Sequence, residues 1–262
     1  MSKKTKRMNK RALGPNLVTL SNLFLGFFAI VMIGRGHFAT ACWLIWIASI
    51  LDMFDGALAR LVKSSSPFGA QIDSLSDITS FGIAPSYLIY RAVFEPLGTI
   101  GLLFAFMPLL AGALRLARFH VVGKVKDRRK FVGLPIPTSA LLLAGCYLYT
   151  RVGYDYRVDI RVWLSLVPIV SLLMVSPIPY WKAYNLITKM IRQPFTGLPV
   201  LVAGVVGMVW TPSRALFPLM IFYTLIGPVE WGLDHLRRLR TSQEDEENMP
   251  KTSSQDEYGG EL

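Results

Sequence analysis

The sequence predicts an all-α fold: a polytopic membrane helix bundle of about eight transmembrane helices, with both termini in the cytoplasm. Two observations support this prediction. Hydrophobic residues make up 52% of the 262 residues and charged residues only 17%, which is too apolar for a soluble domain of this length. Apolar runs long enough to cross a bilayer also recur along the whole chain, separated by short polar loops.

The eight expected spans follow one another without an internal repeat or a separate soluble domain. The sixth and seventh are short and interrupted by proline, so their ends are the least defined. Their ranges are about 17–34, 38–61, 68–91, 97–119, 134–151, 161–177, 197–211 and 214–234.

Three regions of different composition are expected along the chain. Residues 1–14 form a basic cytoplasmic arm next to anionic lipid. Residues 15–240 form the membrane-embedded domain. Residues 241–262 are polar and acidic with little to bury, and we expect them to be disordered.

The distribution of positive charge sets the predicted orientation. With both termini inside, 22 of the 28 Lys and Arg residues fall in cytoplasmic segments and 6 in external turns. This asymmetry is typical of membrane topology, because positively charged loops stay in the cytoplasm. The net charge of +11 is therefore a topological signal, and we expect no nucleic acid as a partner.

Four aspartates stand out because they lie in otherwise apolar spans: Asp52, Asp55, Asp73 and Asp77. A carboxylate inside a membrane is costly and therefore indicates a functional site. The two pairs have helical spacings, i and i+3 in the second span and i and i+4 in the third. An antiparallel hairpin turning about Ser65 would bring the two pairs to matching depths.

Clustered carboxylates repel one another unless cations are present. Oxygen-only ligands suit hard divalent cations, Mg²⁺ or Mn²⁺, and two such ions would balance the four aspartates. A two-metal carboxylate site is a common device for displacement at phosphorus. The sequence thus predicts two divalent cations as cofactors, bound by Asp52, Asp55, Asp73 and Asp77.

The segment 51–81 resembles the CDP-alcohol phosphotransferase family, whose signature is D-x2-D-G-x2-A-R-x8-G-x3-D-x3-D. Every signature position is filled here. The resemblance implies that nucleotide contacts come from the first half of the signature and that the last aspartate, Asp77, is the catalytic base and also a metal ligand. The residues expected to bind the nucleotide are Asn22 in the first span and Asp52, Gly56, Ala59, Arg60 and Gly69.

Other segments resemble one branch of that family, the integral-membrane phosphatidylserine synthases. They are PNLVTLSNL at 15–23, SDITSFGIAP at 76–85, LAGALRLAR at 110–118 and FVGLPIP at 131–137. The branch implies transfer of the phosphatidyl group from CDP-diacylglycerol to L-serine, giving phosphatidylserine and CMP. Because arginine can bind a carboxylate through two hydrogen bonds, Arg115 or Arg118 is the candidate serine ligand.

The resemblance also implies a homodimer in a prokaryotic-type cell membrane, with the site at the cytoplasmic side. Several alternatives stay open. The acceptor could be choline, inositol phosphate or glycerol phosphate, and the lipid could be diacylglycerol or an archaeal ether lipid. Buried acids also line ion pathways, so a divalent-cation transporter is the alternative from another functional class.

Overall fold

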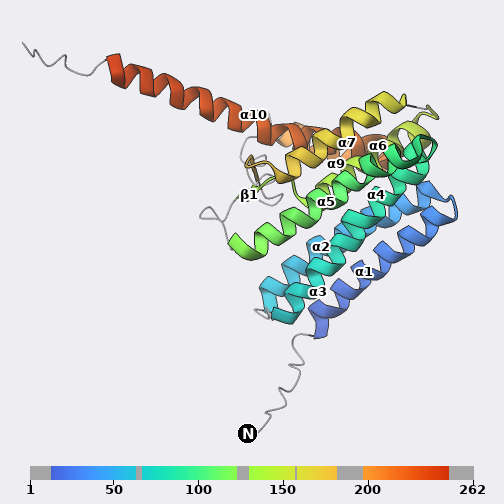
Figure 1. The fold of residues 1–262 in the computed structure, drawn as a ribbon. Helices are drawn as coiled ribbons and strands as arrows, with labels where there is room; N and C mark the ends of the chain where they lie inside the picture. Colours follow the sequence, from blue (N-terminus) through green and yellow to red (C-terminus); the bar gives the residue numbers. More distant parts are fainter. Residues whose placement is uncertain (1–12, 63–66, 123–129, 157, 182–196, 248–262) are drawn as a thin grey trace, which may run out of the picture.

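The structure is a computed structural model that describes residues 13–62, 67–122, 130–156, 158–181 and 197–247. In these residues the chain is a bundle of helices with one short pair of strands (Figure 1). Most of the predicted basic arm and the final part of the predicted tail lie outside the described residues. The predicted all-α class is confirmed except for the two strands.

The first two helices form an antiparallel hairpin. Helix α1 spans Leu13–Gly34 and α2 spans Phe38–Val62. The turn between them passes through Gly36, whose φ of 82° favours glycine. The His37 amide donates to the Met32 carbonyl at 2.9 Å, which closes the end of α1.

The third predicted span is a helical arm assembled from four consecutive segments. They are α3 (Pro67–Asp77), the π-helix η2 (Ile78–Ile83), α4 (Ala84–Ile89) and the π-helix η3 (Tyr90–Phe94). A 3-10 turn, η4 (Glu95–Leu97), and Gly98 at φ 58° then reverse the chain into α5 (Gly98–Val122). A π-helical segment widens the backbone and is frequent at functional sites, and η2 begins directly after Asp77.

A small antiparallel ladder joins two distant parts of the chain. Strand β1 (Lys130–Val132) pairs with β2 (Pro179–Trp181), so that Phe131 lies opposite Tyr180. Gly133 follows β1 at φ 75°, and its amide donates to the Ile178 carbonyl at 2.9 Å. Between the strands lie α6 (Ile136–Tyr147), the π-helix η5 (Leu148–Gly153) and α7 (Ile160–Val175).

The last two helices are α9 (Gly197–Trp210) and α10 (Pro212–Glu247). Helix α10 packs on α6, η5 and β2 and then extends beyond the bundle (Figure 1). Helix α10 continues through Glu247 and so includes the first residues of the predicted tail 241–262. The segment contains Gln and Glu residues, which are good helix formers, and the first proline after it is Pro250. The boundaries of the three regions and the disorder of the tail stay predictions.

Helix lengths and surface composition agree with a membrane protein. Within the part of the chain that the structure describes, three helical stretches are long and apolar enough to cross a bilayer: Leu17–Gly34, Phe68–Arg118, which reverses at Gly98, and Pro212–Leu233. Shorter apolar helices cover Phe38–Phe54 and Ile160–Val175. All eight predicted spans contain helix, while the count of eight crossings and the side of each terminus stay predictions.

Small residues are among those buried between the helices, and many large apolar residues are exposed. Alanines 29, 41, 48, 84 and 140 are fully buried where helices approach one another closely. Large apolar side chains point outward instead, including Phe24, Phe27, Leu103 and Phe106. Exposed apolar surface of this extent is expected of a bundle whose outer face contacts lipid.

Candidate active site

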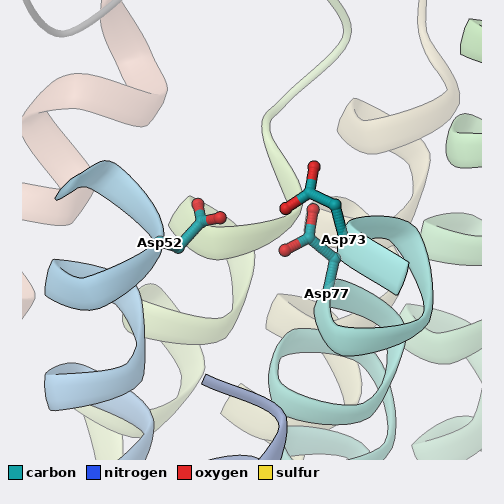
Figure 2. Close-up of side chains that lie close together, drawn as sticks. All are labelled: Asp52, Asp73 and Asp77. Carbon is teal, nitrogen blue, oxygen red and sulfur yellow. The ribbon is translucent and has the colours of Figure 1, made fainter. Parts of the chain in front are cut away.

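Three of the four predicted aspartates meet between α2 and α3. Asp52 comes from α2, and Asp73 and Asp77 lie one turn apart on α3, all three side chains directed into the same space (Figure 2). One carboxylate oxygen from each residue lies within 4.8 Å of the others. All three residues are partly buried. The structure thus brings Asp52 to Asp73 and Asp77. The predicted turn about Ser65 lies outside the described residues.

Two serines fix the third helical arm against α1. The Ser76 hydroxyl donates to the Thr19 carbonyl at 3.1 Å, and the Ser80 hydroxyl donates to the Asn22 carbonyl at 2.9 Å. Both serines are fully buried, and each such bond contributes on the order of 1 kcal/mol. Gly26 lies against Ser80, where a Cβ would be only 2.7 Å from the Ser80 Cα, so only glycine allows this approach.

The donor set of this cluster fits a hard divalent cation. The ligand atoms are carboxylate oxygens alone, the type that Mg²⁺ and Mn²⁺ prefer. Asp77 Oδ1 is buried and has no hydrogen-bond partner among the described residues. A buried carboxylate oxygen without a donor is costly, and a bound cation would remove that cost.

Among the side chains that the structure describes, a basic group lies near the cluster. Arg115, on α5, is partly buried and interacts electrostatically with Asp77. Arg118 is one turn further along the same helix and is exposed. The two arginines were equal candidates from the sequence, and the structure distinguishes them by their exposure.

Comparison with known proteins identifies the family. The family model described as CDP-alcohol phosphatidyltransferase matches residues 12–175, which include all three clustered aspartates. The chain belongs to this family.

Several curated relatives of this phosphatidyltransferase family member carry more specific names. The chain is 34% identical to a CDP-diacylglycerol–serine O-phosphatidyltransferase of Helicobacter pylori, over 86% of this chain and 93% of the relative. It is 38% identical to a protein of the same name from Methanocaldococcus jannaschii, over 64% of this chain and 73% of the relative. An archaetidylserine synthase of Methanothermobacter thermautotrophicus is 34% identical, over 63% and 68%.

The structure describes the side chains of only some of the other residues predicted to contact the nucleotide. Residues Asp55, Gly56, Ala59 and Arg60 lie in the last turns of α2, and their side chains lie outside the described residues. Gly69 lies on α3, one turn before Asp73. Asn22 is 1% exposed, and its side-chain Oδ1 has no hydrogen-bond partner among the described residues. A buried amide oxygen in that state is suited to a ligand's donor.

The structure adds residues near the site that the sequence did not indicate. Ser76 and Ser80 hold the arm that carries Asp77, but serine within an apolar helix also commonly bonds its own backbone, so the pattern was not distinctive. Tyr223, on α10, interacts electrostatically with Arg115. It is far from the aspartates in sequence and lies outside the matched region, and no local motif marks it.

An open cleft of about 420 Å³ lies between the α3–η2 arm and α5. It is lined mainly by apolar side chains, and its lining includes the residues that follow Asp73, Asp77 and Arg115 in sequence. Successive residues on a helix are about 100° apart, so the cleft borders a different side of each helix from the side that carries these charged groups. The lining residues are Gln71, Ser74, Leu75, Ile78, Ala113 and Leu116.

Proposed function

We propose that this CDP-alcohol phosphatidyltransferase family member transfers the phosphatidyl group from CDP-diacylglycerol to L-serine, giving phosphatidylserine and CMP. The observation that carries the proposal is the placement of Arg115, a cation suited to a carboxylate, beside the aspartate cluster. Relatives named as serine O-phosphatidyltransferases or as an archaetidylserine synthase support the same acceptor.

The reaction is a displacement at phosphorus. The serine hydroxyl oxygen forms a bond to the phosphorus that carries the diacylglycerol, and the bond from that phosphorus to the bridging oxygen of the pyrophosphate breaks. CMP leaves with the bridging oxygen. The hydroxyl proton passes to a base, for which we propose Asp77, because a serine hydroxyl is a weak nucleophile at neutral pH.

We propose that Asp52, Asp55, Asp73 and Asp77 hold two divalent cations. When bound, such cations stabilise negative charge on the phosphoryl oxygens and on the departing CMP. Of these four aspartates, Asp77 is also the proposed base, and this role requires one of its carboxylate oxygens to be available to the serine hydroxyl.

The nucleotide is proposed to lie toward α1 and the end of α2. Arg60 would contact its phosphates, and Asp52 would hold a cation that balances their charge. Gly56, Ala59 and Gly69 would leave space for the nucleotide, and the Asn22 side-chain oxygen would accept a hydrogen bond from it. The burial of Asn22 and the state of its Oδ1 support this role.

Arg115 is proposed to bind the serine carboxylate. Its partial burial next to Asp77 would bring the serine hydroxyl close to the base, whereas the exposed Arg118 would contribute mainly general positive charge. The sequence-based candidates thus reduce to Arg115 as the principal serine ligand and Arg118 as a minor one.

The apolar cleft between the α3–η2 arm and α5 is the proposed exit for the lipid chains. It is open and mostly apolar, so an acyl chain could leave the site sideways into the bilayer. We further propose a cytoplasmic site, which a soluble nucleotide product could leave directly, and a homodimer, which rests on family resemblance alone.

An acceptor panel tests the proposal. The purified protein receives CDP-diacylglycerol, Mg²⁺ or Mn²⁺ and one radiolabelled acceptor: serine, choline, inositol phosphate or glycerol phosphate. We expect labelled lipid with serine alone. Labelled lipid with another acceptor and none with serine would contradict the proposal. Repeating the serine reaction with a CDP-activated ether lipid decides between the two lipid classes.

A further inference from the structure

A second cavity, of about 220 Å³, lies at the end of the bundle opposite the aspartate cluster. The helical arm that carries Asp77 in α3 reaches this end at η3 and η4, where its residues line the cavity together with residues of η5 and the start of α7 (Figure 1). At 1.5 Å per helical residue, the arm separates Asp77 from Ala92 in the cavity wall by about 20 Å. The cavity is therefore distinct from the candidate active site.

A single cation faces this cavity. Arg151, in η5, is half-buried and is the one charged side chain among the described residues that line it. Within the part of the chain that the structure describes, no hydrogen bond or ion pair to the Arg151 guanidinium is found. A half-buried guanidinium loses part of its hydration, and without an acceptor nothing offsets that loss. An anion from outside the chain would supply the missing acceptor.

Arg151 differs in this respect from the other described arginines of the predicted external turns. Arg91 pairs with an acid one turn further along its own helix. Arg214 donates through Nε to a backbone carbonyl at 2.9 Å. Arg35 and Arg161 are exposed, so water can solvate their charge. Arg151 alone among these five is half-buried against a cavity and has no acceptor among the described residues.

The walls around Arg151 are aromatic and aliphatic. Trp163 and Tyr147 line the cavity, and each joins an apolar ring system to one polar N–H or O–H group. Val93 and Ile160 add aliphatic surface. Tryptophan and tyrosine gather at membrane–water interfaces, where one part of the side chain meets hydrocarbon and the other meets headgroups. One cation set in such walls suits a ligand that is both anionic and apolar.

We propose that this cavity binds the phosphate of a phospholipid headgroup, at the membrane surface opposite the aspartate cluster. A guanidinium can bind two phosphate oxygens through parallel hydrogen bonds, and basic pockets between transmembrane helices bind lipid headgroups. The cavity is smaller than the roughly 300–1,000 Å³ of ordinary ligand pockets, so it would hold the headgroup while the acyl chains stay in the bilayer. The proposal does not depend on which acceptor the transfer reaction uses.

Thermal unfolding of the full-length protein in detergent tests the proposal with three probes. They are a phosphatidylglycerol, the diacylglycerol with the same acyl chains, and inorganic phosphate. A ligand that binds only the folded protein raises Tm, and we expect saturating phosphatidylglycerol to raise it by roughly 2–4 °C. Diacylglycerol, which lacks the phosphate, should not raise it. An equal shift with diacylglycerol would overturn the role of the phosphate, and an equal shift with inorganic phosphate would overturn the assignment to a lipid.

Matched arginine variants locate the bound lipid. Arg151→Gln removes the charge and keeps a polar side chain, so it should lose most of the shift caused by phosphatidylglycerol. Arg151→Lys keeps the charge without the bidentate geometry and should retain part of the shift. Arg161→Gln is the control, because Arg161 lies at the same end of the bundle and is exposed. A wild-type shift in Arg151→Gln, or an equal loss in Arg161→Gln, would overturn the proposal.

Two further measurements keep the test decisive. If Arg151→Gln is too unstable for its Tm shifts to be compared, native mass spectrometry counts the bound phosphatidylglycerol instead. Wild-type protein should retain one molecule more than Arg151→Gln, and equal numbers would contradict the proposal. Arg151→Gln should also leave the KM values of both substrates within about twofold of wild type, because the cavity lies far from the aspartates. A large increase in either value would place Arg151 in the catalytic site and overturn a separate headgroup site.

Discussion

The aspartate cluster between α2 and α3 and the network between β2 and α10 differ in how far the hydrogen-bonding groups of their side chains are satisfied. The cluster brings together like-charged oxygens, one of which, Asp77 Oδ1, has no hydrogen-bond partner among the described residues. In the network, the three donors of Tyr180, Trp181 and Tyr223 each have an acceptor. A site rich in acceptors is suited to binding cations and substrate, whereas a satisfied network is suited to holding a shape.

Arg115, on α5, interacts electrostatically with Asp77 of the cluster. The comparison therefore predicts that substitutions in the aspartate cluster abolish chemistry, that substitutions of Arg115 affect the acceptor, and that substitutions in the network mainly affect stability. The following predictions proceed from the largest expected effect to the smallest.

The largest effect is expected for Asp52→Asn and Asp73→Asn. Each removes one carboxylate charge from the proposed cation site, so both metal and nucleotide binding should fall and kcat/KM should decrease on the order of 10³-fold. Metal binding can be measured by titration with Mn²⁺, and nucleotide binding by titration with CMP. Retention of wild-type Mn²⁺ affinity in both variants would exclude these residues as ligands.

Asp77→Asn should lower kcat by roughly 10², the range typical of losing a general base. The amide keeps the size of the side chain and one oxygen, so CDP-lipid binding should remain within about tenfold of wild type. Single-turnover kinetics with saturating lipid measures the step directly. Turnover near the wild-type rate would assign the base to another group, and loss of nucleotide binding as severe as in Asp52→Asn would make Asp77 mainly a metal ligand.

Arg115→Gln and Arg118→Gln form a matched pair on one helix. Arg115→Gln should raise the KM for serine by roughly tenfold or more while changing the KM for CDP-diacylglycerol little, because a charged hydrogen-bond partner of the acceptor is lost. Arg118→Gln should change both values less than twofold, since Arg118 is exposed. Steady-state kinetics with each substrate varied in turn gives the four constants. The reverse ranking of the two variants would assign the serine carboxylate to Arg118.

The smallest effect is expected within the network, at Gly227. Gly227→Ala would place a methyl group against the ring of Tyr180, and overpacking of this kind costs about 1–3 kcal/mol, or a few degrees in Tm. Gly232→Ala, on the same helix, meets no described residue within 4 Å and should leave Tm unchanged or slightly raised, because alanine is the better helix former. Thermal unfolding in detergent compares the two, and equal Tm values would show that the packing around Tyr180 adapts easily.

The hairpin of the cluster was predictable because its signals are local. Acidic residues in apolar spans are rare, and the spacing within each helix fixes which of them share a face. The network was not predictable, because its two halves, Trp181 and Tyr223, are far apart in sequence and each is an ordinary interfacial aromatic residue. Glu230, which accepts a hydrogen bond from the Trp181 indole, is likewise distant from Trp181 in sequence.

Helical spans were also predictable from apolar length, but their internal irregularities were not. The π-helical segment after Asp77 depends on packing of Ser80 and Gly82 against α1 and α5, which no local pattern encodes. The ladder that joins 130–132 to 179–181 likewise needs a long-range pairing, since strands of three residues carry too little pattern to recognise.

CMP release in the presence of serine, measured as divalent cations are removed and restored, tests the central claim most directly. The claim is that the aspartate cluster supports cation-dependent transfer from CDP-diacylglycerol to serine. We expect wild-type protein to release CMP only when serine is present, to stop when excess chelator has removed the metal, and to recover when Mg²⁺ or Mn²⁺ is returned. Full serine-dependent turnover with metal removal verified would contradict the account.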